Sequence, residues 1–115
     1  MLKQKRKIVR LLDELLYYAL QADPRKVVVT IEGLADETRI TVEDDGTRRD
    51  EEECQQAECI MNAPCRNEMK DYYSGLAGEK TITLCRLRIV GMMIEGGRVE
   101  SGDEGTRVSV WWGQE

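Results

Sequence analysis

The spacing of apolar residues changes along the chain, and this change constrains the fold more than any other feature. Over residues 2–22, apolar side chains recur every three or four positions, which predicts an amphipathic helix that stops before Pro24. Residues 26–33 are rich in β-branched side chains, and residues 38–44 alternate apolar with polar positions. These two stretches predict a pair of strands joined as a hairpin.

The second half of the chain repeats this order. Residues 79–94 begin with β-branched side chains, as a strand would, but their apolar positions follow a helical face made of Leu84, Leu87, Val90 and Ile94. We therefore expect a helix there, ended by Gly96-Gly97. Residues 98–101 and 106–112 predict two closing strands around a turn. Between the halves, an acidic stretch predicts a short helix over 50–61 followed by a mobile loop.

The predicted order of helix, strand, strand, irregular segment, helix, strand, strand is typical of the α+β class. We expect a two-layer α/β sandwich in which helices cover one face of a mixed sheet. A length of 115 residues indicates a single domain over 1–115.

Composition excludes several functions. The net charge of −5 argues against general nucleic-acid binding, which depends on cationic contacts to phosphates. No apolar run approaches the roughly 20 residues of a membrane span, and no secretory signal pattern opens the chain, so we expect a cytoplasmic protein without membrane contact. The chain has no histidine, which excludes a histidine nucleophile, base, phospho-acceptor or zinc ligand.

Three stretches carry a resemblance to a known superfamily. ELLYYALQADPRKVVVTIE resembles a helix with a Glu-x-x-x-Asn pattern that leads into a strand. VEDDGTRRDEE resembles the Asp-x-Gly-x-Gly box that follows the next strand. RIVGMMIEGGRVESGDEGTRVSVWW resembles the end of a histidine-kinase ATPase domain. In this order, from about Leu11 to Trp112, they resemble the superfamily of gyrase, mismatch-repair ATPases, histidine-kinase catalytic domains and anti-sigma-factor kinases.

This resemblance implies the histidine kinase-like ATPase type of sandwich, with ATP or ADP between sheet and helices under a lid-like segment at about 55–80. Asp44 matches the aspartate that accepts a hydrogen bond from the adenine amino group, a task suited to an ionised carboxylate. Gly46 matches the box glycine that lets the backbone approach the base. Thr106, preceded by Gly105, matches the threonine that supports aspartate and adenine.

The phosphate side departs from the pattern of the superfamily. Tyr18 stands where the Mg²⁺-binding asparagine is expected, and a phenol is a poor substitute for an amide oxygen. Arg48 replaces the second glycine of the box, and Gly78 is the one lid glycine in a matching place. Glu14 lies where gyrase-type members keep a general base, but kinase-type members do not use that position as a base. The resemblance therefore leaves ATP turnover open.

Four cysteines suggest an alternative chemistry. Cys54, Cys59 and Cys65 fall in or near the lid-like segment, where a metal could order the chain in place of a nucleotide. Their spacing lacks the paired C-x2-C pattern of zinc sites and the tighter runs of iron–sulfur motifs. Thiols without a metal are the competing interpretation, and Cys85 is expected to pack in the core.

The residues favour a degenerate domain of the histidine kinase-like ATPase superfamily, acting as a cytoplasmic regulatory or signalling module. Such a domain would bind adenine nucleotide weakly, without efficient turnover, and would act on a protein partner or as a homodimer. One alternative is an active anti-sigma-type protein kinase or ATPase. A second is a metal- or redox-responsive module that uses the lid cysteines.

Overall fold

A computed structural model describes residues 2, 4–62 and 79–113 of the chain. It contains the helices α1 (Lys5–Leu20), α2 (Glu51–Asn62) and α4 (Glu79–Gly91) and the strands β1 (Val27–Gly33), β2 (Glu37–Asp44), β3 (Gly96–Gly102) and β4 (Gly105–Gly113). The predicted α+β class and the order of elements are confirmed, including the helix that we favoured over a strand after residue 78.

The four strands form one sheet in the order β1-β2-β4-β3, and all three neighbouring pairs are antiparallel. The expectation of a mixed sheet was therefore wrong for the strands that the structure describes. The physical reason is the connectivity. β1–β2 and β3–β4 are hairpins, which are antiparallel by construction, and the helical connection returns the chain so that β4 runs against β2.

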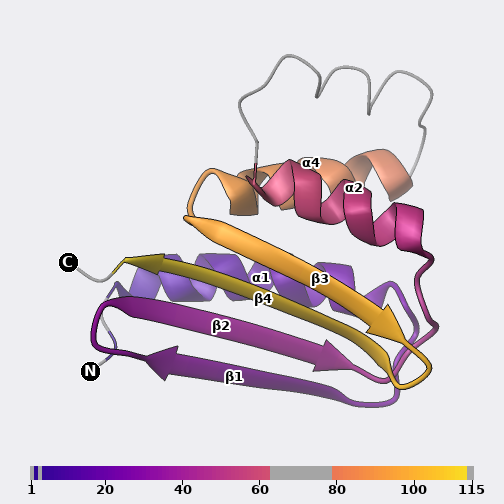
Figure 1. Ribbon diagram of the computed structural model, residues 1–115, viewed down its shortest axis with the longest axis horizontal. Helices are drawn as coiled ribbons and strands as arrows, with labels where there is room; N and C mark the ends of the chain where they lie inside the picture. The colour runs from indigo at the N-terminus through magenta and orange to yellow at the C-terminus, as the bar shows by residue number, and fades with distance from the viewer. Residues whose placement is uncertain (1, 3, 63–78, 114–115) are drawn as a thin grey trace.

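The helices pack on one face of the sheet, as predicted, and the core lies between the two layers (Figure 1). Along β2 and β4, alternate residues point toward the helices and are buried. The inward apolar side chains of these strands are Ile40, Val42, Val108, Val110 and Trp112. From α1, the same core receives Ile8, Leu11, Leu15, Tyr18 and Ala19.

The end of α4 differs from the prediction. The helix ends at Gly91, and Gly96-Gly97 are the first residues of β3. Gly91 is required where α4 approaches α2, since a Cβ there would lie 2.8 Å from the carbonyl oxygen of Met61. A Cβ on Gly96 would lie 2.6 Å from the Trp111 ring. The two adjacent glycines thus serve packing against the sheet and helices instead of ending the helix.

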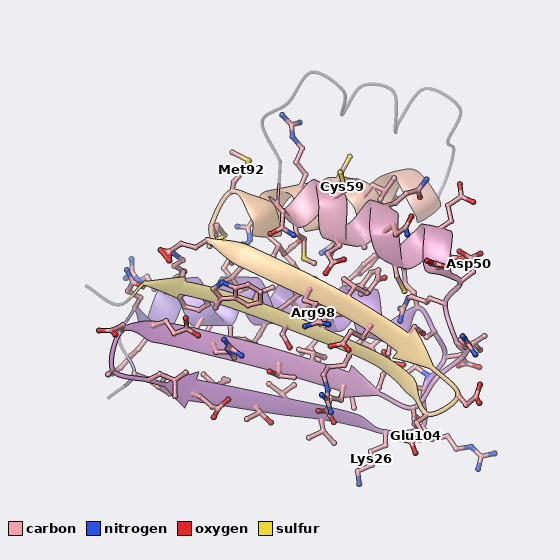
Figure 2. All side chains as sticks on the ribbon, viewed as in Figure 1. Lys26, Asp50, Cys59, Met92, Arg98 and Glu104 are labelled. Carbon is pink, nitrogen blue, oxygen red and sulfur yellow. The ribbon has the colours of Figure 1, made fainter. Side chains whose placement is uncertain are left out.

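The predicted lid-like segment is partly helical. Residues 55–62 form the last two thirds of α2, while Cys65 and Gly78 lie outside the described residues. The start of α2 has a local cause, because the Asp50 carboxylate accepts the backbone N–H of Glu53 at 2.8 Å. Three glutamates in the first turn also complement the helix dipole. Figure 2 shows Asp50 at this end of α2.

None of the helices within the described ranges is long and apolar enough to cross a lipid bilayer.

Candidate functional site

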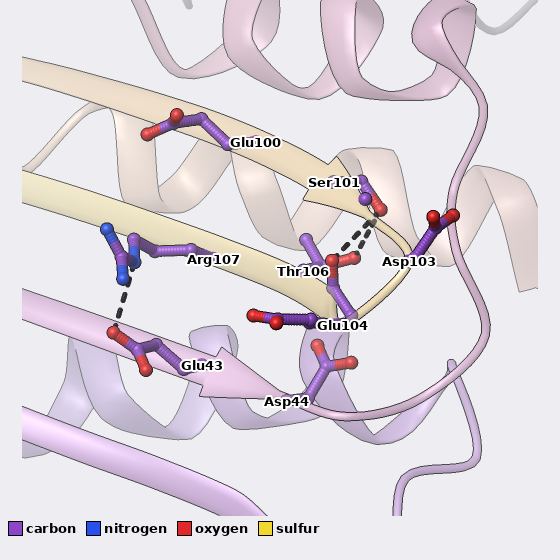
Figure 3. A pocket seen from close by; sticks show the side chains of 10 residues that line it. Glu43, Asp44, Glu100, Ser101, Asp103, Glu104, Thr106 and Arg107 are labelled. Carbon is purple, nitrogen blue, oxygen red and sulfur yellow. Dashed lines mark hydrogen bonds and ion pairs between the residues drawn. The ribbon is translucent and has the colours of Figure 1, made fainter.

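The ends of β2 and β4 bring two predicted site residues together. Asp44, the last residue of β2, is the register partner of Thr106 in β4. Both are buried, with exposed fractions of 6% and 2%. Figure 3 shows Asp44, Thr106 and Ser101 at this end of the sheet. The spacing in the sequence gave no direct evidence of this contact, which arises because β4 pairs along the full length of β2.

A hydroxyl pair continues the site into β3. The Ser101 and Thr106 hydroxyl oxygens lie 2.9 Å apart, and the Ser101 hydroxyl also accepts the backbone N–H of Arg49 at 2.9 Å. Ser101 therefore fixes the backbone position from which the Arg49 side chain extends. We call Asp44, Arg49, Tyr18, Ser101 and Thr106 the Asp44 site.

The Arg49 side chain occupies the centre of the Asp44 site and is 8% exposed. Its Nη1 lies 3.4 Å from Oδ2 of Asp44, and its Nη2 donates to the backbone carbonyl of Tyr18. The guanidinium also stacks on the Tyr18 ring, with its carbon 4.0 Å from the ring centroid. The other oxygen of Asp44, Oδ1, accepts the N–H of Gly46 at 2.9 Å. Both carboxylate oxygens are therefore engaged by the chain itself.

The turn after β2 directs the chain toward this arrangement. Asp45 Oδ1 accepts the backbone N–H groups of Lys26 and Arg25, at 2.9 and 2.8 Å, and these hydrogen bonds lower the pKa of Asp45. Thr47 N–H donates to the carbonyl of Ala22 at 2.9 Å. The two adjacent aspartates thus have different roles: Asp45 fixes the turn, and Asp44 pairs with Arg49.

Close packing against Ala22 explains why residue 46 is a glycine, in addition to the role at a base that the resemblance predicts. A Cβ at this position would lie 2.3 Å from the carbonyl oxygen of Ala22. Gly105 is constrained more strongly, with φ of 119° and an added Cβ 1.8 Å from the carbonyl oxygen of Asp44. Both glycines allow close backbone approach around Asp44, so their presence alone does not indicate a bound base.

Tyr18, predicted in place of a Mg²⁺ ligand, is buried beside Arg49. Burial raises the pKa of Tyr18 to about 12, an effect that the positive charge of Arg49 partly opposes. Its hydroxyl has no hydrogen-bond partner among the described residues. The phenol thus keeps its proton at neutral pH and contributes no charged oxygen for a cation.

A small pocket of about 230 Å³ lies between α1, α2 and α4, next to the Asp44 site. Arg49 and Tyr18 form one wall, Leu84 and Leu87 another. At its rim the Thr83 hydroxyl donates to Oε1 of Gln21 at 2.6 Å. Pockets for drug-sized ligands measure about 300–1,000 Å³, so this one is below that range with Arg49 in place.

A second hollow, of about 390 Å³, opens at the β3–β4 turn. Its lining includes five carboxylate residues: Glu43, Asp44, Glu100, Asp103 and Glu104. Arg107, also in the lining, pairs with Glu43 at 3.0 Å (Figure 3). Among its neighbours, Arg48 binds Asp103 at 3.1 Å. The acidic lining does not favour the phosphates of a nucleotide.

Glu14, the predicted candidate base, is buried at 4% exposure away from Asp44. Its Oε1 lies 3.2 Å from Nη1 of Arg86 in α4 and 3.9 Å from Nε of Arg10. Its Oε2 has no hydrogen-bond partner within the described part of the chain. Glu14 therefore links α1 to α4, and its carboxylate is already paired with cations.

The described cysteines do not converge. Cys54 is buried in α2, where desolvation raises its pKa, whereas Cys59 is exposed. Figure 2 shows Cys59 on the side of α2 that faces away from the sheet. Within the described residues, no group of three or more potential ligands could hold a metal ion. The three-cysteine site that includes Cys65 stays a prediction. Cys85 is exposed, so its expected place in the core was wrong.

Sequence reasoning missed Arg49 and Ser101 as members of the site. Both lie within the stretches that carried the resemblance, but neither has a counterpart among the residues expected to bind nucleotide. The available signal was the basic pair Arg48-Arg49 directly after an acidic strand end. Only the fold distinguishes the two: Arg48 is exposed and Arg49 is buried.

No family model matches this chain, and no curated protein matches it either.

Proposed function

We propose that this chain is a degenerate histidine kinase-like ATPase domain that regulates a protein partner in the cytoplasm. The observation that carries the proposal is the buried pair of Asp44 and Arg49. In the resemblance, Asp44 corresponds to the carboxylate that accepts a hydrogen bond from adenine. Here the arginine of the same chain occupies that carboxylate.

The arrangement around Asp44 supports the ancestry. A strand-end aspartate lies opposite Thr106, a glycine follows two residues later, and helices cover the same face of the sheet. These are the positions at which the resemblance expects Asp, Gly and Thr. The four-stranded antiparallel sheet with helices on one face is compatible with a two-layer α/β sandwich.

The energetics favour weak nucleotide binding. An adenine ring that approached Asp44 would displace Arg49 from its carboxylate and from the face of Tyr18. Separating a buried ion pair leaves an uncompensated charge, which costs about 3–5 kcal/mol. A cost of this size removes most of the affinity that one hydrogen-bonded base provides, since 1.4 kcal/mol is about a factor of ten.

Turnover is disfavoured for separate reasons. Tyr18 offers a neutral phenol where an asparagine would hold Mg²⁺. Glu14 is paired with Arg86 and would act as a base only after losing that contact. We therefore place the function in protein binding, with nucleotide as a weak ligand at most.

Calorimetric titration with ADP and a non-hydrolysable ATP analogue, each with and without Mg²⁺, tests this proposal. We expect wild-type protein to show no saturation below about 1 mM, which corresponds to about −4 kcal/mol. Arg49→Ala frees the Asp44 carboxylate and should bind ADP more tightly than wild type. The control Asp44→Asn/Arg49→Ala should lose this gain. Micromolar, Mg²⁺-dependent binding by wild type would instead favour the active kinase or ATPase alternative.

A further inference from the structure

The two edges of the sheet differ in whether other parts of the chain bond to their backbone. At β3, Asn62 of α2 accepts the N–H of Gly97 at 3.1 Å and donates to its carbonyl at 2.9 Å. Glu58 accepts the N–H of Val99 at 3.4 Å. The edge of β3 is thus covered by side chains of α2. At the other edge, no described residue outside β2 bonds to the backbone of β1.

Hydrogen bonds at both ends of β1 identify the backbone groups that point outward. The Lys26 carbonyl accepts the N–H of Asp45 at 3.3 Å, and the Leu34 N–H donates to the carbonyl of Glu37 at 2.8 Å. Backbone groups of alternate residues point to opposite sides of a strand, so even-numbered residues bond to β2. The N–H and C=O groups of Val27, Val29 and Ile31 therefore point away from the sheet.

Four of the five side chains over residues 27–31 are apolar, the exception being Thr30. Val28 and Val29 are 41% and 37% exposed, and Val27 and Ile31 are half-buried. Edge strands are usually protected by charges, proline or a bulge, because open backbone groups pair with other strands. Residues 27–31 contain none of these residues. The strand is suited to pairing with another strand.

We propose that two copies of this chain associate through β1, antiparallel and centred on Val29, and join their sheets into one. In this register Val29 lies opposite Val29 of the second copy, and Val27 lies opposite Ile31. All of these residues direct their N–H and C=O groups outward, so the two strands can exchange backbone hydrogen bonds. The proposal does not depend on nucleotide binding.

Charge complementarity favours a second copy of this chain as the partner that pairs with β1. Centring on Val29 places Lys26 directly opposite Glu32 of the other copy, twice by symmetry. Both side chains are exposed and have no partner among the described residues; Figure 2 shows Lys26 at the end of β1. Opposite charges directly across a strand pair stabilise it, whereas like charges destabilise it. Centring on Thr30 would instead place Lys26 opposite Leu34 and lose both pairs.

A second apolar surface borders this edge. Glu14 and Tyr17 of α1 contact Arg86 of α4, so the opposite side of α1 faces the β1 side of the sheet. That side carries a stripe at helical spacing: Val9, Leu12, Leu16 and Leu20. Val9 and Leu20 are 66% and 60% exposed. A two-fold axis through Val29 would place the two stripes on the same face of the joined sheet.

Sedimentation velocity of the full chain over a range of concentrations tests the proposal. We expect a dimer of twice the 13.2 kDa chain mass. Val29→Pro removes an outward N–H without removing a hydrogen bond to β2, and should abolish the dimer while circular dichroism stays unchanged. Met92→Lys, at a 64% exposed position on the α4–β3 connection, is the control and should leave the dimer intact.

Charge reversal tests the register and does not rely on a proline variant that folds. Lys26→Glu alone and Glu32→Lys alone should each raise the dimer dissociation constant about tenfold, because two like-charge pairs form. The combined Lys26→Glu/Glu32→Lys variant should restore the wild-type constant. A wild-type monomer at all concentrations, or a dimer for which the combined change gives no rescue, overturns the proposal.

Discussion

Asp44 and Glu14 are both buried carboxylates paired with arginine, but the chain satisfies them differently. Asp44 has both oxygens engaged, and its arginine is 8% exposed. Glu14 has one oxygen without a partner in the described structure, and the side chain of its closer arginine, Arg86, is 35% exposed. Water can replace Arg86 if the pair separates, whereas it has little access to Arg49. The two carboxylates therefore differ in how much stability depends on their partners.

Under the proposed function, this difference is how a nucleotide-binding arrangement would become structural. A carboxylate whose oxygens are both held by its own chain cannot accept a ligand without releasing a partner. Arg49 holds the ends of β2 and α1 together, through Asp44 and the carbonyl of Tyr18. Glu14 links α1 to α4 through an arginine whose side chain is 35% exposed, which is a weaker constraint.

Arg49→Ala should have the largest effect on this comparison. It leaves the Asp44 carboxylate buried without a cation, so we expect a loss of about 3–5 kcal/mol in the free energy of unfolding. Urea unfolding followed by circular dichroism measures this loss. The control is Arg39→Ala, which removes a partly exposed pair with Glu37 and a cation–π contact with Trp111, and should cost about 1 kcal/mol, less than the loss of Arg49. Equal effects of the two variants would contradict the account.

Gly105→Ala should follow in size, because it disturbs the backbone of Asp44 itself. The φ of 119° and the Cβ at 1.8 Å from the Asp44 carbonyl oxygen make alanine strained at this position. We expect a loss of at least about 2 kcal/mol. Gly102→Ala is the matched control in the same hairpin, since nothing lies within 4 Å of its added Cβ. A neutral Gly105→Ala would show that the backbones are not in this contact.

The pH dependence of stability tests the burial of Tyr18 in the Asp44 site. Its pKa is about 12 in the folded state and 10.0 in the unfolded chain. Between these two pH values the unfolded chain loses the phenol proton while the folded chain keeps it. Stability from this group is fully present below pH 10 and falls as pH rises toward 12, by about 2–3 kcal/mol. Tyr18→Phe should lack this fall and be near neutral at pH 7, because the hydroxyl has no described partner. Parallel stability curves for the two proteins above pH 10 would refute the assignment.

Glu14→Gln should have the smallest effect. Because the Arg86 side chain is 35% exposed, it regains water when the charge on Glu14 is removed. We expect a change of less than about 1 kcal/mol in thermal unfolding. Asp44→Asn, the matching substitution at the other carboxylate, should cost more, since it leaves Arg49 buried without a counter-charge. If Glu14→Gln proves the more damaging of the two, the contrast between the sites is wrong.

The sequence predicted those parts of the molecule that follow from local periodicity. The helix ended near Pro24, the hairpin of 26–44 and the helical face of Leu84, Leu87 and Val90 are examples. It did not predict that α4 ends at Gly91, or that Gly91 lets α4 approach Met61, because that approach is a contact made across the fold.

For the candidate site, the sequence identified candidate residues but not the interactions that they make. Asp44, Gly46 and Thr106 were identified from their places in the motifs, and the structure brings Asp44 and Thr106 together. The state of Asp44 was not predictable, since the burial of Arg49 depends on Tyr18 and Ser101 from distant elements. Adjacent arginines in the sequence gave no indication that one would be exposed and the other buried.

The most direct test of the account is whether Arg49 keeps adenine from Asp44. ¹H–¹⁵N NMR titration with ADP, following the amide signals of Gly46, Gly105 and Thr106, observes the site itself. We predict no saturating shift in wild type up to about 1 mM ADP, and a saturating shift in Arg49→Ala that disappears in Asp44→Asn/Arg49→Ala. A saturating shift of these signals in wild type at micromolar ADP would contradict the account.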